Sequence, residues 1–209
     1  MAQSTADGLI LEAGNQVVGV GVGLLIRGGG TVSQAIGRAG NGEGLFTNVA
    51  RTPYAPTNST FGQAFDFSCA AASCRMAANL MDTPEAYVRQ AILTDTSGTS
   101  LSNIPNGLQQ LGFSGTARYS TTMTTESITT ATNNGASVIV NVTTETGGVH
   151  AIVVDSVKGG MAYIRDPWPL GIGSSYAVPV NSLGSVLTGR GVAVLPWLLL
   201  GIVMQKNAD

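Results

Sequence analysis

The chain has 209 residues, of which only 11% are charged, with 10 Lys and Arg against 12 Asp and Glu. This length suits one domain of ordinary size, alone or with a smaller segment, and is too short for two large domains. The near balance of charge argues against a general nucleic-acid binder, which depends on a basic surface. Two Cys and one His are too few for a disulfide framework or a closed zinc site, so we expect no metal and no cofactor.

Two apolar stretches raise the question of membrane insertion. The first, residues 8–26, contains Glu12, and a carboxylate at the centre of a bilayer costs about 2.5–3.5 kcal/mol on insertion scales. The second, residues 191–204, is short and contains Pro196. No positively charged segment precedes the first stretch, so it does not resemble a secretion signal. We therefore expect no stable membrane insertion.

The composition changes near residue 57. Residues 1–57 are rich in Gly and small apolar residues, with GVGVG at 19–23 and GGG at 28–30, and they end in the Pro-containing segment RTPYAPT. Glycine costs backbone entropy in any regular element. We therefore expect an N-terminal arm and linker over residues 1–57 and a folded domain over residues 58–209.

Helices are predicted in the first half of this domain. Ser68 is in position to cap a helix over residues 69–81, which read CAAASCRMAANLM. Thr83, Pro84 and Glu85 supply a cap, a proline at the first helical position and a first-turn acid to a second helix that ends near residue 93. Shorter helices are expected at about 106–111 and 126–133.

Strands are predicted in the second half. Apolar runs rich in β-branched residues, separated by turn residues, indicate strands at 137–143, 149–157, 161–166, 174–180 and 191–198. Gly159 and Gly160 form a turn between the second and the third of these. Helices followed by strands predict an α+β domain of two layers, in which N-terminal helices pack on a mostly antiparallel sheet.

Four residues could carry chemistry, because a cysteine nucleophile needs a thiolate, a base and a group that orients the base. Cys69 begins the first predicted helix, where the helix dipole favours a thiolate. His150, the single His of the chain, begins an apolar strand, and Asp166 ends the next strand, which a tight hairpin would bring beside it. Gln63 lies six residues before Cys69 and could donate a side-chain N–H to an oxyanion, together with the backbone N–H of Cys69.

Plainer interpretations compete with these roles. A buried Cys is usually a small hydrophobic residue, which we expect for Cys74 and which stays open for Cys69. His150 could equally be a satisfied core histidine. Asp155 competes with Asp166 as the group that orients the base, and an Asp at a strand end is often only a turn residue.

The segments that carry these residues resemble the bacteriocin-processing, double-glycine leader peptidases, a branch of the papain-like cysteine proteases. FGQAFDFSCAAASCRMAANLM resembles the nucleophile segment of that family, with Gln six residues before the catalytic Cys. GVHAIVVDSVKGGMAYIRDPWP is similar to the family's His strand, hairpin and Asp-Pro, and LTGRGVAVLP resembles its closing strand. The resemblance covers about residues 59–198. It implies a papain-like fold and a catalytic site of Cys69, His150, Asp166 and Gln63.

The chain departs from these peptidases in two respects. Ala70 follows Cys69, where the leader peptidases usually have Gly, and no G-x-x-x-x-G-K-[ST] motif of the usual attached transporter is present. A free-standing peptidase behind a Gly-rich arm resembles the toxin domain of a bacterial polymorphic toxin, and DPWP resembles papain-like bacterial effector proteases. The resemblance thus implies a toxin of interbacterial competition, delivered from the producing cell into the target-cell cytoplasm, with an immunity protein as partner.

By the same resemblance, the reaction is cleavage of an intracellular protein after an exposed Gly-Gly segment, because a narrow cleft admits only residues without side chains. Four alternatives stay open: processing of a double-glycine leader peptide, a glutamine deamidase or transglutaminase of the same fold, a domain that only binds Gly-Gly segments, and a membrane-active toxin that inserts residues 8–30. Residues 28–30 are also a candidate self-cleavage site, although a flexible Gly turn explains them as well.

Overall fold

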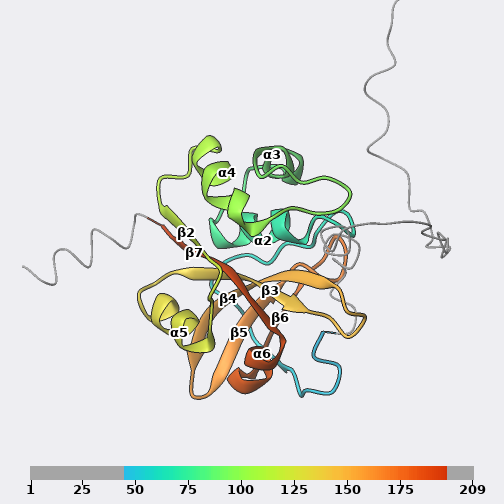
Figure 1. The fold of residues 1–209 in the computed structure, drawn as a ribbon, viewed down its shortest axis with the longest axis vertical. Helices are drawn as coiled ribbons and strands as arrows, with labels where there is room; N and C mark the ends of the chain where they lie inside the picture. The colour runs from blue at the N-terminus through green and yellow to red at the C-terminus, as the bar shows by residue number, and fades with distance from the viewer. Residues whose placement is uncertain (1–44, 197–209) are drawn as a thin grey trace, which may run out of the picture. The chain divides into compact units, whose positions relative to one another are not determined.

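A seven-stranded sheet organises residues 45–196, the part of the chain that the computed structural model describes (Figure 1). The strand order is β1-β6-β5-β4-β3-β7-β2, and each neighbouring pair runs antiparallel. The strands are β1 (Thr52–Pro53), β2 (Thr116–Ser120), β3 (Ser137–Thr143), β4 (Val149–Lys158), β5 (Met161–Asp166), β6 (Ser174–Pro179) and β7 (Leu187–Leu195). The helices are α2 (Cys69–Ala77), α3 (Glu85–Ala91), the 3-10 helix η2 (Leu101–Asn103), α4 (Ile104–Gln110), α5 (Thr125–Asn133) and α6 (Val180–Val186).

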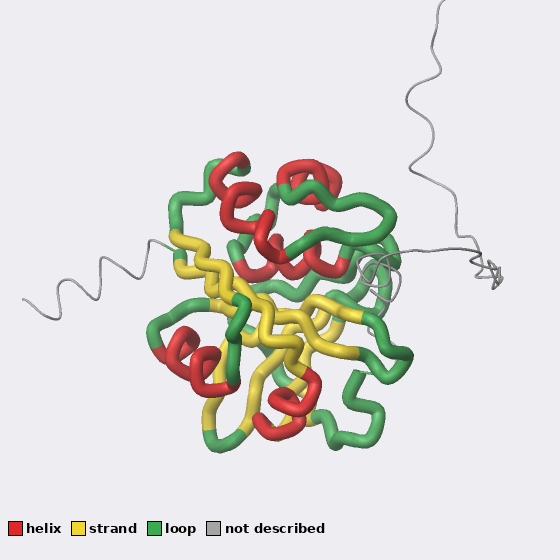
Figure 2. Tube along the Cα trace, viewed as in Figure 1, coloured by secondary structure: helices red, strands yellow, loops and turns green. Residues whose placement is uncertain are grey.

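Helices cover both faces of the sheet (Figure 2). On one face, α2, α3 and α4 pack with Ile139, Val153 and neighbouring residues in one hydrophobic cluster. On the other face, α5 and α6 pack with Val138 and Val140 in a second cluster. The α+β prediction is confirmed, but the prediction of two layers is wrong. Successive residues of β3 are apolar and face opposite sides, so both faces of the sheet need cover.

Each predicted strand is present; most differ by at most one residue at their ends, but the last begins at Leu187 instead of residue 191 and ends at Leu195. β3 and β5 have the predicted bounds, because their apolar runs are flanked by turns that the sequence marks. Gly159 and Gly160 join β4 to β5 with φ values of 57° and 77°, a region of backbone conformation that favours glycine. Four elements of the described residues have no counterpart among the predicted ones: β1, η2, β2 and α6.

The predicted helices are also present, the first two with shorter bounds and α4 and α5 within two residues of the predicted ends. The first predicted helix ends at Ala77 instead of residue 81, and the second begins after Pro84, which stands at its N-cap. Among the helices of residues 45–196, only α5 has the reciprocal cap expected of a well-marked helix start, with Thr124 and Ser127 bonding each other's backbone N–H groups.

Residues 45–57, which the sequence analysis assigns to the arm, pack with the folded domain. Leu45 and Phe46 are buried in the second hydrophobic cluster. Thr52 and Pro53 form β1 against β6. The remainder of the predicted arm lies outside the described residues, and so do the first apolar stretch and the candidate cleavage site at residues 28–30.

Part of the second apolar stretch has a place in the sheet. Residues 191–195 belong to β7, which pairs with both β2 and β3. None of the helices within residues 45–196 is long and apolar enough to cross a bilayer.

Candidate active site

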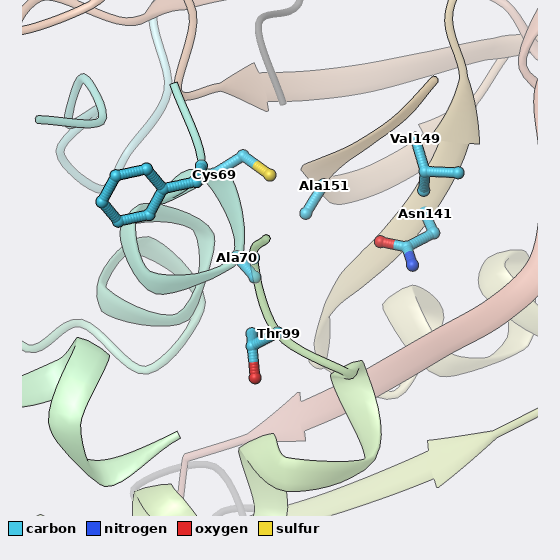
Figure 3. Close-up of a pocket in the computed structure, with 8 residues that line it drawn as sticks. Cys69, Ala70, Thr99, Asn141, Val149 and Ala151 are labelled. Carbon is cyan, nitrogen blue, oxygen red and sulfur yellow. The ribbon is translucent and has the colours of Figure 1, made fainter. Parts of the chain in front are cut away.

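Cys69 is the first residue of α2, at the contact between this helix and the sheet. The helix begins with the small residues CAAAS, which are buried and let its backbone approach β4 closely. Ser73 donates from Oγ to the carbonyl oxygen of Ala151 in β4 at 3.0 Å. Figure 3 shows the Cys69 sulfur pointing from the start of the helix towards the strand that carries Ala151. The packing therefore directs a cysteine side chain at the strand of the single histidine.

His150 is the second residue of β4 and is fully buried. Its Nε2 lies 2.7 Å from Oδ1 of Asp166. Burial alone lowers the pKa of His150, but the charge and hydrogen bond of Asp166, followed by a hydrogen bond with Cys69, outweigh it and raise the pKa to about 10. Since Nε2 bonds Asp166, the bond with Cys69 falls to Nδ1. The imidazole therefore links the cysteine to the carboxylate.

Asp166 ends β5 and is buried with its carboxylate fully engaged. Oδ1 also accepts the backbone N–H of Trp168 at 2.9 Å, and Oδ2 accepts the hydroxyl of Tyr176 at 2.7 Å. These bonds from the histidine, the backbone and the tyrosine fix the position of the carboxylate beside the imidazole. Such a pair holds the histidine in one orientation and one tautomer.

Asp155, the alternative partner for the histidine, has another role. The register between β4 and β5 shifts between Val154 and Ser156, where Asp155 lies. Its two carboxylate oxygens accept Arg165 Nε and Nη2, each at 2.7 Å. Arg165 is fully buried and also donates to the carbonyl of Met76 in α2 at 3.0 Å. Asp155 thus fixes Arg165, whose side chain connects the sheet to the helix that begins at Cys69.

Gln63 is fully buried in the loop before Cys69. Its backbone N–H donates to the carbonyl of Pro167 at 2.9 Å, and its carbonyl accepts the N–H of Gly171 at 2.9 Å. Its side-chain Nε2 donates to the carbonyl of Phe65 at 2.8 Å. These bonds join the Gln63 loop to the segment that follows Asp166, so the structure brings all four predicted residues into one region.

The predicted capping role of Ser68 is wrong. Its Oγ exchanges hydrogen bonds with the backbone N–H and carbonyl of Phe65, each at 3.0 Å, and makes no cap bond to α2. The hydroxyl instead closes the turn that precedes Cys69. The backbone N–H groups at the start of α2 are therefore not covered by this side chain.

The sequence did not predict a role for Glu85 in the site, but its carboxylate bonds residues at both ends of the turn that precedes Cys69. Its Oε2 accepts the N–H of Ala64 at 3.0 Å, and its carboxylate also bonds the Ser68 hydroxyl. Burial raises the pKa of Glu85 against these hydrogen bonds and the charges of Arg89 and Arg75. No sequence signal other than the first-turn acid of a helix marked this residue.

A narrow cavity opens beside Cys69 (Figure 3). Its volume is about 20 Å³, and its lining comprises Phe67, Cys69, Ala70, Gly98, Thr99, Asn141, Val149 and Ala151. A space of this size holds about one water molecule. Gly98, Thr99 and Asn141 also line a larger cavity that includes Asp95 and Arg190.

Cys74 lies in the same helix as Cys69 in a different environment. It is fully buried in the first cluster, and burial raises the pKa of its thiol to about 12. Both cysteines are free thiols. Within residues 45–196, no group of His, Cys, Asp and Glu side chains is arranged to hold a metal ion.

The fold is found in solved structures, although no protein-family model and no curated protein sequence matches the chain. The chain is similar to a double-glycine-motif protease from an AMS/PCAT transporter, solved in complex with a leader peptide, with a TM-score of 0.53 and 17% identity over 70% of this chain and 99% of that one. It is also similar to the peptidase domain of Streptococcus ComA, a bifunctional ABC transporter of a quorum-sensing pathway, with a TM-score of 0.51 and 19% identity over 70% of this chain and 97% of that one. The expected papain-like fold of the double-glycine peptidases is therefore confirmed.

Proposed function

We propose that the domain is a cysteine endopeptidase with Cys69 as nucleophile, His150 as acid and base, and Asp166 as the group that orients His150. One observation carries the proposal: the single His of the chain is fully buried between the Cys69 thiol and the buried carboxylate of Asp166. A core histidine with a structural role needs hydrogen-bond partners but no thiol at the start of a helix. The combination matches the requirements of an activated nucleophile.

The reaction proceeds by acyl transfer. The Cys69 thiolate attacks the carbonyl carbon of the scissile peptide bond, while protonated His150 stands beside it. The C–N bond breaks, and His150 gives its proton to the leaving amine. Water then attacks the thioester, His150 takes one proton of this water, and the C–S bond breaks to release the carboxylic acid and regenerate the thiolate and imidazolium pair.

The negative oxygen of the tetrahedral intermediate needs hydrogen-bond donors. We assign this role to the Gln63 side-chain amide and the backbone N–H of Cys69. The position of Cys69 at the first residue of α2 supports it, because a helix begins with N–H groups that have no partner within the helix. The Gln63 backbone bonds to Pro167 and Gly171 would keep the amide at a constant distance from the Asp166 loop.

Cleavage after Gly-Gly is the preference that the cavity supports. Its volume of about 20 Å³ beside Cys69 leaves little room for a substrate side chain next to the scissile bond. Glycine places only backbone in such a space. The solved AMS/PCAT protease is in complex with a leader peptide, which supports a peptide as the substrate class for the present chain.

We further propose that this peptidase is a toxin or effector domain that acts on an intracellular protein of a competing bacterium and is neutralised by an immunity protein. The support is the Gly-rich composition of residues 1–44 and the resemblance of the DPWP segment to bacterial effector proteases. Processing of a double-glycine leader peptide is the second candidate, because the two solved structures described above are a protease and a peptidase domain of transporters.

Controlled expression of the wild type and the Cys69→Ala variant in bacteria tests this function. We expect loss of viability with the wild type only, with new protein N-termini after Gly-Gly segments in the same cells. Harmless expression of both, with cleavage of an added double-glycine leader peptide, would favour the leader peptidase. Ammonia release without new N-termini would identify a deamidase or transglutaminase, and no covalent change would contradict the enzyme.

A further inference from the structure

The carboxylate of Asp166 is held at both oxygens by different partners. Oδ1 accepts His150 Nε2 at 2.7 Å and the N–H of Trp168 at 2.9 Å. Oδ2 accepts the hydroxyl of Tyr176 at 2.7 Å. A carboxylate bonded at one oxygen only can rotate about its Cβ–Cγ bond. The bond from Tyr176 opposes that rotation.

The Tyr176 ring is itself fixed on several sides. β6 carries it between β5 and β1, with Ile164 and Pro53 as its paired residues. The ring is buried, the Phe46 ring meets it edge-on at 6.1 Å between centroids, and the Arg51 guanidinium lies 4.6 Å from its centroid. Its hydroxyl is thus presented to Asp166 by a side chain that has little freedom to turn.

We propose that Tyr176 is a positioning residue that acts on His150 through Asp166. Its hydroxyl fixes the plane of the carboxylate and shares its negative charge, so that the imidazole is aligned with Cys69 and releases its proton readily. This inference rests on the proposed function for its catalytic meaning. The physical coupling between Tyr176 and His150 stands on the geometry alone.

The charged and titratable neighbours set the direction of the effect. His150 faces Asp166 from β5 and Cys69 from α2, while Tyr176 faces Asp166 and Arg51. When the Tyr176 hydroxyl is removed, the negative charge of Asp166 is less shared and attracts the imidazolium more strongly. The pKa of His150 then rises, and its proton passes less readily to the leaving amine.

The Tyr176→Phe variant removes only the hydroxyl, and Tyr54→Phe is a matched control. Tyr54 donates to Oδ2 of Asp155 at 2.8 Å, a bond of the same kind to a carboxylate that pairs with Arg165 instead of His150. The single His gives one set of ring ¹⁵N signals, whose dependence on pH reports its pKa without assignment. This readout needs no catalytic activity.

We expect the pKa of His150 to rise by about half a unit or more in Tyr176→Phe and to stay at the wild-type value in Tyr54→Phe. With a Gly-Gly peptide, kcat falls about 10-fold in Tyr176→Phe while KM is unchanged. An unchanged or lowered pKa in a folded Tyr176→Phe protein would overturn the inference. If that variant does not fold, the wild-type protein can be labelled with 3-fluorotyrosine, whose more acidic hydroxyl is a stronger hydrogen-bond donor. We then expect a lower pKa of His150. An unchanged pKa would overturn the inference.

The two proposals fail in different ways. A wild-type protein that cleaves no peptide, together with the expected change in the His150 signals, would contradict the peptidase and leave the coupling between Tyr176 and His150 intact. An active wild type with identical His150 signals in both variants would contradict the coupling alone.

Discussion

The candidate site is assembled from two sides of the molecule that are held by different interactions. On the helical side, Cys69 is the first residue of α2, and Gln63 lies in the loop before it. Side chains of α2 and α3 contact this loop. On the sheet side, His150 and Asp166 belong to strands whose register is set by backbone hydrogen bonds. Backbone pairing between strands therefore fixes the base, whereas the turn before Cys69 depends more on a few side-chain contacts, besides the backbone bonds of Gln63.

Those contacts surround the turn before the cysteine. Arg75 lies over the Phe61 ring at 4.2 Å, Arg89 lies over the Phe65 ring at 4.6 Å, and Glu85 bonds the N–H of Ala64. Contacts between a cation and a ring are each worth about 0.5–1 kcal/mol at exposed sites. The helical side is therefore the more easily disturbed, and substitutions can separate the two contributions.

The largest expected effect comes from the two cysteines of α2. Cys69→Ala removes the proposed nucleophile and should lower kcat by at least about 10³-fold, because no other group can form the thioester. Cys74→Ala, deep in the same helix, should keep most of the activity. Peptide cleavage and denaturant unfolding are measured for both, and equal loss of activity in two folded variants would contradict the assignment of Cys69.

The second largest effect distinguishes the two aspartates of the sheet. Asp166→Asn should lower kcat by about 10²–10⁴-fold with little change in folding, since it disturbs the tautomer and charge balance of His150. Asp155→Asn leaves the buried Arg165 without its charge partner and should lower the free energy of unfolding by about 3 kcal/mol. The reverse pattern, with activity lost in Asp155→Asn and stability lost in Asp166→Asn, would exchange their roles.

The third prediction concerns how the free energy of unfolding depends on pH through His150, on the sheet side. The folded protein holds the pKa of His150 at about 10, above the ordinary value of about 6.5. The folded state thus binds a proton that the unfolded chain has released, so this contribution to stability is full below about pH 6.5 and is lost as pH rises to about 10. Denaturant unfolding across this range should show a decline in wild type that is absent in His150→Gln, and parallel curves would contradict it.

The smallest effect is expected at Glu85, on the helical side. Glu85→Ala removes the acceptor for the Ala64 N–H and should lower kcat about 10-fold with a small change in KM, because the Gln63 turn loosens. Glu85→Gln keeps an acceptor oxygen and should recover most of the loss. Kinetics of the two variants provide the test, and equal activity in both would mean that Glu85 does not position the turn.

Much of the fold and the site could be predicted because the signals are local. β3 and β5 were predicted with their observed bounds, since apolar runs between turn residues specify strands within a few residues. Cys69 and His150 stood out because reactive residue types are scarce in this chain, which has one His and two Cys. The sequence placed one at a helix start and the other at a strand start, and the packing of α2 on β4 brings them together.

Other features depend on contacts between segments far apart in the chain. The packing of α5 and α6 on the second face of the sheet, the bond from Tyr176 to Asp166 and the turn held by Glu85 left no local pattern, because each joins distant residues. The sequence left the choice between Asp155 and Asp166 open for the same reason. A shift in register between β4 and β5 falls at Asp155, and the composition of the two strands does not indicate such a shift.

The sequence by itself thus determined the type of most elements, the antiparallel sheet and the candidate site residues Cys69, His150 and Gln63, with Asp166 and Asp155 as alternatives. These depend on local propensity, hydrophobic period and the scarcity of reactive side chains. Only the tertiary structure decided which carboxylate bonds the histidine, which residues hold the turn before Cys69 and that residues 45–57 pack with the domain. Those outcomes depend on strand register and on close packing between distant segments, and both follow from the whole fold.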